Sequence, residues 1–493
     1  MQRILPITQA LALFDAAATR RIEQRAAATL PPYTLMARAG EAVARLALAV
    51  APHAQRVWVA AGPGNNGGDG LEAACHLRRW GKDVTVSLIG DAIALPADAR
   101  AALARAQAAG VRFEGSAKDA PELAIDALLG LGASRAPQGA LEAAIRQLNA
   151  LPCPVLAIDV PSGLRADTGQ ALGGACVNAS HTLTLLTLKP GLFTAAGRDH
   201  AGVVWLDSLG VDTSADTPQA WLSGVKAAPA RRHAQHKGSF GDVAIVGGGV
   251  GMSGAALLAA RAAHAAGAGR VFVEMLDGSA AAIDTLHPEL MFRHGWSGGS
   301  APAILGASTV VGGCGGDDAI RAPLPRLLSL ARRLVLDADA LNALASDAAL
   351  TPLLHARADR GLATVLTPHP LEAARLLGCT TLDVQADRLQ AAHGLARRYR
   401  CVVVLKGSGS VIAAPGELAR INSTGNAALA SAGTGDVLAG WLGGRWAQLD
   451  SGDEMAAAFA VAAQAVAEHG AAAEPQPPGA LRAGDLIERL HRR

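Results

Sequence analysis

The sequence predicts an α/β protein of two domains, each built around a mostly parallel sheet. Its 493 residues exceed what one ordinary core holds, because cores usually split after about 100 to 200 residues. Short runs rich in β-branched residues and leucine alternate with alanine-rich helical patterns, which is typical of parallel sheets covered by helices. Glycine-rich turns occur in both halves, where they follow apolar runs and therefore mark the ends of strands.

The first half alternates regularly between the two kinds of element. Strands are expected at residues 57–61, 84–89, 123–128, 155–160 and 182–188, and helices at 71–80, 97–109 and 141–150. Ahead of this series, residues 8–50 predict two helices separated by Pro31 and Pro32. The alternation predicts a three-layer parallel-sheet domain over residues 1–215.

A second series follows a stretch rich in aspartate, threonine, alanine and proline. Residues 216–230 are therefore expected to be a linker, and residues 231–493 a second domain. Its strands are expected at residues 241–247, 271–275, 334–337, 364–367 and 402–405, and its helices at 254–265, 372–377 and 437–446. The two halves show no mutual repeat, which indicates a fusion of two unlike α/β domains.

Composition excludes several classes of function. Half of the residues are hydrophobic, the net charge is only +2, and no basic stripe with interleaved aromatics is present, so nucleic acid is not an expected partner. The six cysteines form no C-x-x-C pair and no zinc-like cluster, which favours reduced thiols. No apolar run reaches about 18 residues and no secretory signal is recognised, so a soluble, cytoplasmic protein is expected. A homo-oligomer is compatible with the sequence, although no residue pattern indicates one.

The stretch from Gly62 to Gly70 satisfies the G-x-G-x-x-G pattern of a dinucleotide-binding turn. It follows an apolar run, and Asp91 after the next strand could bind a ribose, as in a dehydrogenase. A P-loop is excluded, because no Gly-Lys-Ser/Thr closes the stretch. Asn65, Asn66 and Asp69 add amide oxygens and a carboxylate where a plain pyrophosphate turn would avoid negative charge, so a substrate site and a simple glycine-rich loop both stay open.

Two further strand ends in this half carry acids. Asp126 and Asp159 each follow an apolar run, and the second is followed by Ser162. Oxygen-bearing strand ends at one sheet edge can form a cation site or an acid/base pocket. Each acid alone is more often a turn residue, and a half that only binds a ligand is the alternative.

The second half contains a glycine turn with an acid directly before a helical pattern. The backbone N–H groups of Gly433-Thr-Gly435-Asp436 would converge at the start of a helix, where the helix dipole favours an anion. Asp436 could accept a proton from a hydroxyl during phosphoryl transfer, although an acid at this position is also a common helix cap.

Other strand ends carry further candidate binding residues that would lie near Asp436. Lys406 stands at the mouth of a turn suited to a nucleotide phosphate, and His369 lies between two prolines that restrict the backbone. The glycine turn before Ala255 is a third strand-to-helix junction. In open α/β sheets, ligands bind outside the carboxyl ends of strands, where these loops would meet.

The order of the second-half motifs resembles the ribokinase-like superfamily and, more narrowly, the NAD(P)H-hydrate dehydratase family. The resemblance covers residues 230–490 and rests on Lys237–Gly241, Gly251–Ala256, Asp337–Asn342, Thr367–Pro370, Lys406–Ser410 and Gly433–Asp436. One departure is Cys314, which stands where the family usually has a glycine.

The first half resembles the NAD(P)H-hydrate epimerase family, known as the YjeF amino-terminal domain, across residues 8–215. The strand-end loops carry this resemblance, and Leu35–Gly40 fits the early helix of that family, although Ala37 stands where an acid is common. The two resemblances imply a Rossmann-like domain followed by a ribokinase-like domain.

The resemblances also imply roles for individual residues. In the first domain, the substrate would be held by Asn65, Asn66, Gly67, Gly68, Asp69, Gly130, Leu131, Gly132, Ala133, Ser134, Arg135 and Ala136, with catalytic Asp159 at the hydrated nicotinamide ring. Asn66, Asp126 and Ser162 would bind K⁺. In the second domain, Ala255, Gly315, His369 and catalytic Asp436 would surround the substrate, and Lys406, Gly407, Ser408, Gly409, Ser410 and Gly435 the adenine nucleotide.

The implied activity is repair of hydrated NADH and NADPH. The first domain would interconvert R and S epimers, and the second would dehydrate the S epimer with ADP and Mg²⁺, giving NAD(P)H, AMP and phosphate. The alternatives are a ribokinase-like small-molecule kinase fused to a nucleotide-binding module, which would release a stable phosphorylated product, and a nicotinamide-dependent dehydrogenase.

Overall fold

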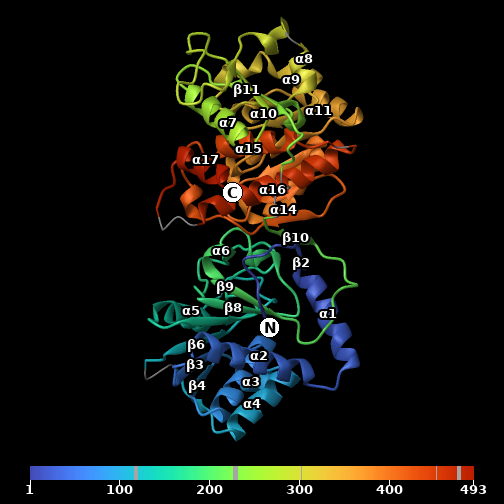
Figure 1. Cartoon of the computed structure of the whole chain (residues 1–493). Coiled ribbons are helices and arrows are strands. Elements are labelled where there is room, and N and C mark those ends of the chain that lie inside the picture. The colour runs from blue at the N-terminus through green and yellow to red at the C-terminus, as the bar shows by residue number, and fades with distance from the viewer. Residues whose placement is uncertain (116–119, 226–230, 301, 451, 475–478) are drawn as a thin grey trace. The chain divides into compact units, whose positions relative to one another are not determined.

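The computed structural model describes residues 1–115, 120–225, 231–300, 302–450, 452–474 and 479–493. The chain divides into two compact units, of which the first comprises residues 1–5 and 11–222 and the second residues 6–10 and 223–493 (Figure 1). Each unit is a mixture of helices and strands around its own sheet, so the predicted α/β class with two sheets is confirmed.

The sheet of the first unit is almost entirely parallel. Its strands lie in the order β1 (Gln2–Arg3), β9 (Val203–Asp207), β8 (His181–Leu185), β7 (Val155–Ile158), β6 (Leu123–Ala127), β3 (Arg56–Ala61), β4 (Asp83–Leu88) and β5 (Arg112–Phe113). Only β1 pairs antiparallel with its neighbour. The carboxyl ends of β3, β6 and β7 therefore lie at one edge, which is where the sequence places its acids and amides.

Helices α2 (Thr34–Val50), α3 (Asn65–Arg79) and α4 (Ala97–Ala108) cover one face of this sheet, and α5 (Ala140–Ala150) covers the other. The unit also contains α1 (Ala16–Thr29) and α6 (Gly197–His200). Val57 and Val59 of β3 pack in the core beneath α2 and α3, whereas Trp58 packs with α5 on the opposite face. The period of two along a strand sends neighbouring side chains to opposite faces, which gives the expected three layers.

Part of the expected linker is a strand. Residues 220–223 form β10 (Ala220–Ser223), which pairs antiparallel with β2 (Leu11–Leu13). Ala220 and Leu222 are fully buried. The composition of this stretch suggested a linker because the apolar alternation is too short to recognise, and residues 226–230 lie outside the described residues.

The sheet of the second unit begins parallel and ends antiparallel. Its strands lie in the order β13 (Met291–Phe292), β12 (Arg270–Met275), β11 (Asp242–Gly247), β14 (Thr309–Gly312), β15 (Arg333–Leu336), β16 (Thr364–Leu366), β17 (Val402–Leu405), β18 (Val411–Ala413) and β19 (Ala419–Asn422). Pairing is parallel from β13 to β17 and antiparallel from β17 to β19. All five expected strands of this half are present.

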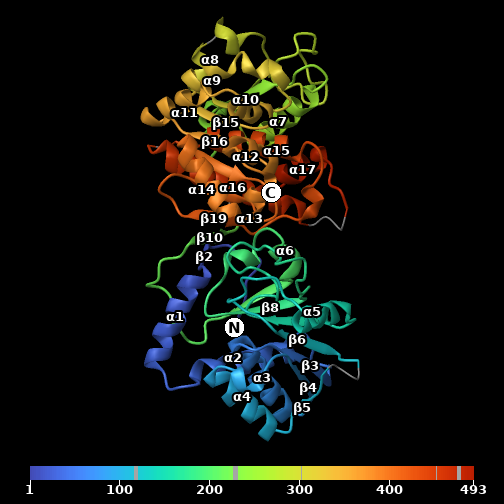
Figure 2. The same cartoon turned by 180° about the vertical axis from the view of Figure 1, so that it is seen from behind.

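The helices of the second unit are α7 (Ser253–Ala265), α8 (Pro302–Ala307), α9 (Leu324–Leu330), α10 (Asp339–Ser346), α11 (Leu350–Asp359), α12 (Pro370–Leu377), α13 (Thr381–Ala386), α14 (Arg388–Tyr399), α15 (Thr434–Ala447), α16 (Glu454–Ala473) and α17 (Ala483–His491). Three of these helices pack against α15, namely α7, α16 and α17. Figure 2 shows α15 beside α7 and α17 from behind. A Cβ on Gly440 would lie 1.9 Å from the carbonyl oxygen of Ala259, so glycine permits the close approach of α15 to α7.

No helix in the described part of the chain combines the length and the apolar character that a membrane crossing requires.

Candidate active sites

The glycine stretch of the first unit is the beginning of a helix. Helix α3 begins at Asn65, six residues before the expected start at residue 71. Glycine has a low helix propensity, so the sequence pattern alone indicates a loop. Packing overrides it, because a Cβ on Gly67 would lie 2.0 Å from the carbonyl oxygen of Gly62 and a Cβ on Gly70 2.4 Å from Cβ of Ala127.

A cavity of about 730 Å³ opens at the carboxyl ends of these strands. Of the predicted substrate-binding residues, its wall contains Asn65, Asn66, Asp69, Gly130, Leu131, Gly132, Ala133 and Asp159. Gly67 and Gly68 are buried against their neighbours, and Ser134, Arg135 and Ala136 are exposed beyond the wall. Asp91, the candidate ribose ligand of a dehydrogenase, is exposed and accepts the Ile93 N–H at a short 3₁₀ turn.

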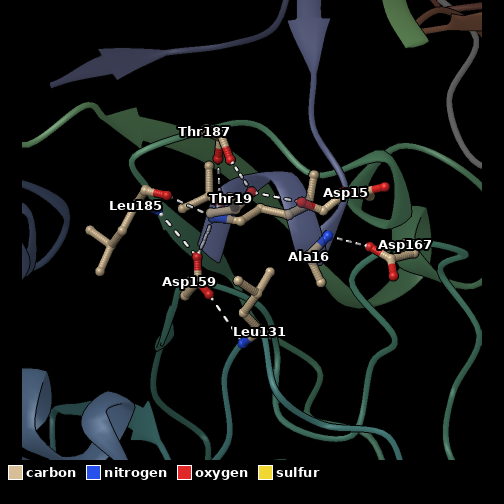
Figure 3. Close-up of polar contacts among 10 residues, drawn as sticks. Asp15, Ala16, Thr19, Leu131, Asp159, Asp167, Leu185 and Thr187 are labelled. Atoms are coloured by element: carbon tan, nitrogen blue, oxygen red, sulfur yellow. Dashed lines mark hydrogen bonds and ion pairs between the residues drawn. The ribbon is translucent and has the colours of Figure 1, made fainter. Parts of the chain in front are cut away.

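Asp159 is held in an unusual conformation at the end of β7. Its φ angle is +66°, a region that residues other than glycine rarely adopt. The Leu131 N–H donates to its Oδ2 at 3.2 Å, and the Leu185 N–H donates to its Oδ1 at 3.4 Å (Figure 3). These bonds tie the carboxylate to the Gly130–Ala136 loop and to β8.

A lysine that the sequence reasoning missed pairs with Asp159. The Lys189 ammonium lies 2.5 Å from Oδ1 of Asp159, and it also donates to Thr184 Oγ1 and to the Leu185 carbonyl oxygen. The Lys189 side chain is completely buried. The three contacts of this buried ammonium hold the Asp159 side chain in a fixed orientation. Its sequence signal was weak: Lys189 is one of six lysines and directly follows an expected strand.

Two more carboxyl groups face the same cavity. Burial raises the pKa of Asp69 well above its usual range, and the negative charges of Asp159 and Glu23 add to this shift. Burial and then Asp159 also raise the pKa of Glu23, another residue that sequence reasoning missed. The cavity wall thus combines an ion-paired carboxylate with two carboxyl groups whose pKa is raised.

Helix α1 brings Glu23 to the site. The Thr19 hydroxyl forms a 2.7 Å hydrogen bond with that of Thr187, and the Ala16 N–H donates to Asp167 Oδ1 at 2.7 Å (Figure 3). Thr19 and Glu23 are one helical turn apart, and both line the cavity. This spacing was the readable signal, but only the tertiary fold shows which sheet edge α1 covers.

The predicted K⁺ ligands surround the start of the Gly130–Ala136 loop. Ser162 donates its N–H to Oδ2 of Asp126 at 2.8 Å and its hydroxyl to Oδ1 at 2.6 Å. The side-chain amide of Asn66 lies against Gly130, and its buried Nδ2 has no partner among the described residues. Burial raises the pKa of Asp126 to about 6, and no described residue forms an ion pair with it.

In the second unit, Asp436 lies in the first turn of α15, after Gly433 in the left-handed conformation. Burial and then the negative charge of Asp337 raise the pKa of Asp436 to about 7, while Cys314 and Lys406 oppose this rise. Lys406 lies 2.7 Å from Oδ1 of Asp337. A carboxyl group with this pKa is suited to accept a proton near neutral pH.

Cys314, the departure from the family pattern, is part of this cluster. Its thiol is fully buried and, with the Asp337 and Asp436 carboxylates, forms a group whose ligand atoms all lie within 4.8 Å of one another. Burial and the two carboxylates raise the pKa of Cys314 well above its usual range, so the neutral thiol can donate to Asp436.

The structure brings Ala255 and Gly315 together beside this cluster. Gly315 has a φ of +59°, and a Cβ on it would lie 2.8 Å from the Cβ of Ala255. The Gly249 N–H donates to the Gly315 carbonyl oxygen, which joins the two glycine turns. The loop carrying Cys314 is therefore packed directly on the start of α7.

His369 is the amino-terminal cap of α12. Its Nδ1 accepts the Leu371 N–H at 3.1 Å, and Nε2 lies 3.1 Å from Oε1 of Glu372. The imidazole is partly exposed, so it is available to a ligand while the cap fixes its direction. The Lys406 N–H donates to the Pro368 carbonyl oxygen, which places the two predicted loops side by side.

A buried arginine shapes the Lys406–Ser410 turn. Arg388 donates to the carbonyl oxygens of Leu405 and Lys406, both at 3.1 Å, and a Cβ on Gly407 would lie 3.0 Å from its guanidinium. Burial lowers the pKa of Arg388 to about 10. Gly407 and Ser408 are exposed, Gly409 is buried, and Gly435 faces Lys406, with a Cβ on it 3.3 Å from Nζ.

Family comparisons match each half of the chain. The family described as YjeF-related protein N-terminus matches residues 32–191, and the family described as NAD(P)H-hydrate dehydratase matches residues 243–492.

Whole-chain relatives carry one consistent description. A bifunctional NAD(P)H-hydrate repair enzyme of Escherichia coli is 39% identical over 476 residues, covering 92% of this chain and 88% of the relative. One of Coxiella burnetii is 38% identical over 432 residues, covering 84% and 86%. The small-molecule kinase alternative is not favoured, because these relatives span both halves.

Among solved structures, an ADP/ATP-dependent NAD(P)H-hydrate dehydratase of Bacillus subtilis, co-crystallised with ATP and Mg²⁺, is 27% identical. It covers 54% of this chain and 92% of its own, with a TM-score of 0.43. From the two family matches and the whole-chain relatives, we conclude that the chain belongs to the family of bifunctional NAD(P)H-hydrate repair enzymes.

Proposed function

We propose that the chain restores NADH and NADPH from their hydrated forms in two steps. Residues 1–215 would be the epimerase domain, which interconverts the R and S hydrates, and residues 231–493 the dehydratase domain, with the segment 216–230, which includes β10, between them. The dehydratase would use ADP on the S hydrate and release NAD(P)H, AMP and phosphate. One observation carries the dehydratase assignment: Asp436, at a helix start, has a pKa of about 7 beside the Lys406 and Asp337 pair.

In the dehydratase, Asp436 would remove the proton of the ring hydroxyl as its oxygen attacks the terminal phosphorus of ADP. The bond between that phosphorus and the bridging oxygen breaks, and AMP leaves. The N–H groups at the start of α15, from Gly433 to Gly435, would stabilise the charge on the transferred phosphoryl group. The C–O bond of the resulting phosphate ester then breaks, and phosphate leaves with the bonding electrons. Loss of a proton from the neighbouring carbon restores the ring double bond.

The nucleotide would lie along the turn from Lys406 to Ser410. Lys406 is a fixed ammonium at the mouth of this turn, and Arg388 holds the turn from behind. ADP would enter as its Mg²⁺ complex, so we treat this cation as part of the substrate. The cluster of Cys314, Asp337 and Asp436 does not fit a resident Mg²⁺, because Lys406 already pairs with Asp337 and a thiol is a poor ligand for this ion.

The hydrated ring would be enclosed by Ala255, Gly315 and His369. Ala255 and Gly315 are small residues that lie close to each other, which would let the ring approach the backbone closely. His369 is fixed by its capping bonds and keeps an exposed edge for a polar group of the substrate.

In the epimerase, the nucleotide would lie against Asn65, Asn66 and the Gly130–Ala136 loop, and the hydrated ring against Asp159. Epimerisation requires one group that accepts a proton and one that returns it. We assign acceptance to Asp159, which pairs with Lys189, and donation to Asp69, whose pKa burial raises. Both side chains line the same cavity.

The residues at Asp126 fit a monovalent cation. Asp126 is a fully buried carboxylate without an ion-pair partner in the described chain, next to the Ser162 hydroxyl and the Asn66 amide. A bound K⁺ would supply the missing positive charge and fix the start of the Gly130–Ala136 loop. These three residues would hold it through oxygen atoms, which hard cations prefer.

The test is an assay of the purified S hydrate of NADH with ADP. Wild-type protein is expected to produce NADH, AMP and phosphate in equal amounts, and Asp436→Asn to lose about 100- to 10,000-fold in rate, because a general base contributes that much. The matched control is Asp450→Asn, an exposed aspartate of the same unit. An Asp436→Asn protein that works at the parental rate would refute the assignment, as would a stable phosphorylated product in place of free phosphate.

A further inference from the structure

The second unit contains a cavity that the proposed function does not use. Its volume is about 790 Å³, and it lies where α7 and α15 end, next to α16 and β19. Every lining residue belongs to the second unit. Gln448, in its wall, follows Asp436 by 12 positions along α15 and its C-cap, a distance of about 18 Å at the rise of a helix. The cavity is therefore separate from the dehydratase site.

The charge of this cavity has one sign. Four arginines line it, namely Arg231, Arg232, Arg420 and Arg445, and no aspartate or glutamate does so. A volume of this size lies within the usual range for small-molecule sites. Four guanidinium groups around one hollow repel one another unless counter-charges or an anionic ligand compensate them.

Two of the four guanidinium groups already have polar partners within the protein. Arg445 pairs with Oε1 of Glu468 at 3.2 Å. Arg231 donates to the carbonyl oxygen of Gly267 at 2.7 Å, at the end of α7, and stacks over the Phe240 ring at 3.8 Å. These contacts fix both side chains in the wall, and the carbonyl group takes only part of the hydrogen-bonding capacity of Arg231.

The guanidinium groups of the other two arginines have no hydrogen-bond or ion-pair partner among the described residues. Arg420 is held over the Phe459 ring at 4.9 Å, which orients the group without using its N–H donors. The hydrogen bonds of Arg232 to the cavity wall are both made by its backbone: its N–H donates to Oε1 of Gln235, and its carbonyl oxygen accepts from the Gln235 N–H. The guanidinium donors of Arg232 and Arg420 therefore lie in the wall of the same cavity.

Neutral donors complete the wall. Because Gln235 uses its oxygen to accept from Arg232, its amide N–H₂ group remains to donate. Ser239 accepts from the His236 N–H at 3.3 Å, which leaves its hydroxyl hydrogen for another acceptor. A wall of guanidinium, amide and hydroxyl donors matches a ligand that carries only acceptors.

We propose that this cavity is a binding site for a small molecule with a phosphate or pyrophosphate group, separate from the dehydratase site. Guanidinium groups bind phosphate oxygens through paired, charge-assisted hydrogen bonds, and the free donors of Arg232 and Arg420 are available for them. Inorganic pyrophosphate and a nucleoside diphosphate share this chemistry.

Calorimetric titration of the full-length protein with pyrophosphate tests the proposal. The dehydratase turn at Lys406, the epimerase cavity of the first unit and this cavity should all bind pyrophosphate, so wild-type protein should show three sites per chain. Arg232→Gln/Arg420→Gln should remove one of them, with a loss of affinity of at least about tenfold, since each charge-assisted bond contributes roughly that factor. Arg397→Gln is the control, because Arg397 is an exposed arginine on α14 away from the cavity.

Three further measurements separate the outcomes. The midpoint of thermal unfolding shows whether Arg420→Gln, which loses its contact with Phe459, is still folded, and Arg232→Gln alone keeps the test valid because that side chain has no contact to lose. ADP titrated into the wild-type protein and into the same variants identifies the source. At the site that the variants lose, tighter binding of ADP than of pyrophosphate indicates a nucleotide, and equal binding indicates an inorganic ion. The same number of sites in wild-type protein and in the double variant, or equal loss in Arg397→Gln, would overturn the proposal. S-hydrate turnover by the double variant should stay at the wild-type level, so its result is independent of the dehydratase assignment.

Discussion

The Lys189 ammonium and the Asp159 carboxylate form a buried ion pair, 2.5 Å apart, in the wall of the first-unit cavity. The Lys189 side chain is completely buried. The pair joins the end of β7 to the segment after β8, and it places a fixed negative charge where the substrate ring is proposed to lie.

Breaking this pair from the lysine side should destabilise the first unit. Lys189→Met leaves a carboxylate with its main cationic partner removed, and the loss of one member of a buried pair usually costs about 3 to 5 kcal/mol. Urea denaturation should show a loss of this order. The double variant Asp159→Asn/Lys189→Met should lose less than the sum of the single variants, because no charge is left unpaired. Additive losses would mean that the two groups do not interact.

The first two glycines of the Gly62–Gly70 stretch should respond differently to substitution by alanine. A Cβ on Gly62 would lie 1.8 Å from the Leu128 carbonyl oxygen, whereas a Cβ on Gly64 would meet nothing within 4 Å. Gly62→Ala should therefore cost about 1 to 3 kcal/mol and reduce epimerase activity, and Gly64→Ala should stay within about 0.5 kcal/mol of the parent. Thermal unfolding and an epimerisation assay check this. Equal effects would contradict the packing explanation.

Potassium should stabilise the first unit through Asp126. A ligand that binds only the folded state raises its stability, so the unfolding midpoint should be higher in potassium chloride than in equal sodium chloride. Asp126→Asn should lose this response, and it should also cost about 1 to 3 kcal/mol in sodium chloride, because the amide cannot accept at both positions from the Ser162 N–H and hydroxyl. A potassium response that survives in Asp126→Asn would place the ion elsewhere.

Dehydratase activity should rise with pH through about 7. The pKa of Asp436 is raised to about 7, so the carboxyl group is protonated below this pH and cannot accept the hydroxyl proton, whereas above it the carboxylate form is present. The measurement is kcat against pH with saturating S hydrate and ADP, and the rate should fall about tenfold per pH unit on the acidic side.

Cys314 should influence the pH at which this activity is lost on the acidic side, here called the acidic limb of the pH profile. The hydrogen bond from its thiol lowers the pKa of Asp436, so Cys314→Ala should shift the limb to higher pH. Cys401→Ala is the matched control, because Cys401 is also a buried cysteine of this unit but does not contact Asp436. An unchanged limb in Cys314→Ala would show that the thiol is only a packing group.

The sequence predicted those parts of the sites that depend on strand ends. Parallel strands bring their carboxyl ends to one sheet edge. Asp126 could therefore be grouped with Asp159, and Lys406 with Asp436, from the sequence alone. Lys189 and Glu23 could not be found in this way. Lys189 reaches Asp159 only because β8 runs beside β7, and Glu23 only because α1 covers that edge of the sheet.

Local signals failed where packing overrides propensity. Helix α3 begins within the glycine stretch because neighbouring backbone excludes side chains there, which no propensity scale contains. Strand β10 is stabilised by its pairing with β2, more than 200 positions away in the chain. Both differences arise from contacts that are distant in sequence.

One measurement tests the central claim most directly: conversion of an equal mixture of R and S hydrates of NADH by the full-length protein with ADP. If both units act as proposed, both epimers should disappear and NADH should reach the total hydrate supplied. Asp159→Asn should stop once the S hydrate is used, and Asp436→Asn should form no NADH. Wild-type protein that leaves the R hydrate, or forms NADH without ADP consumption, would contradict the account.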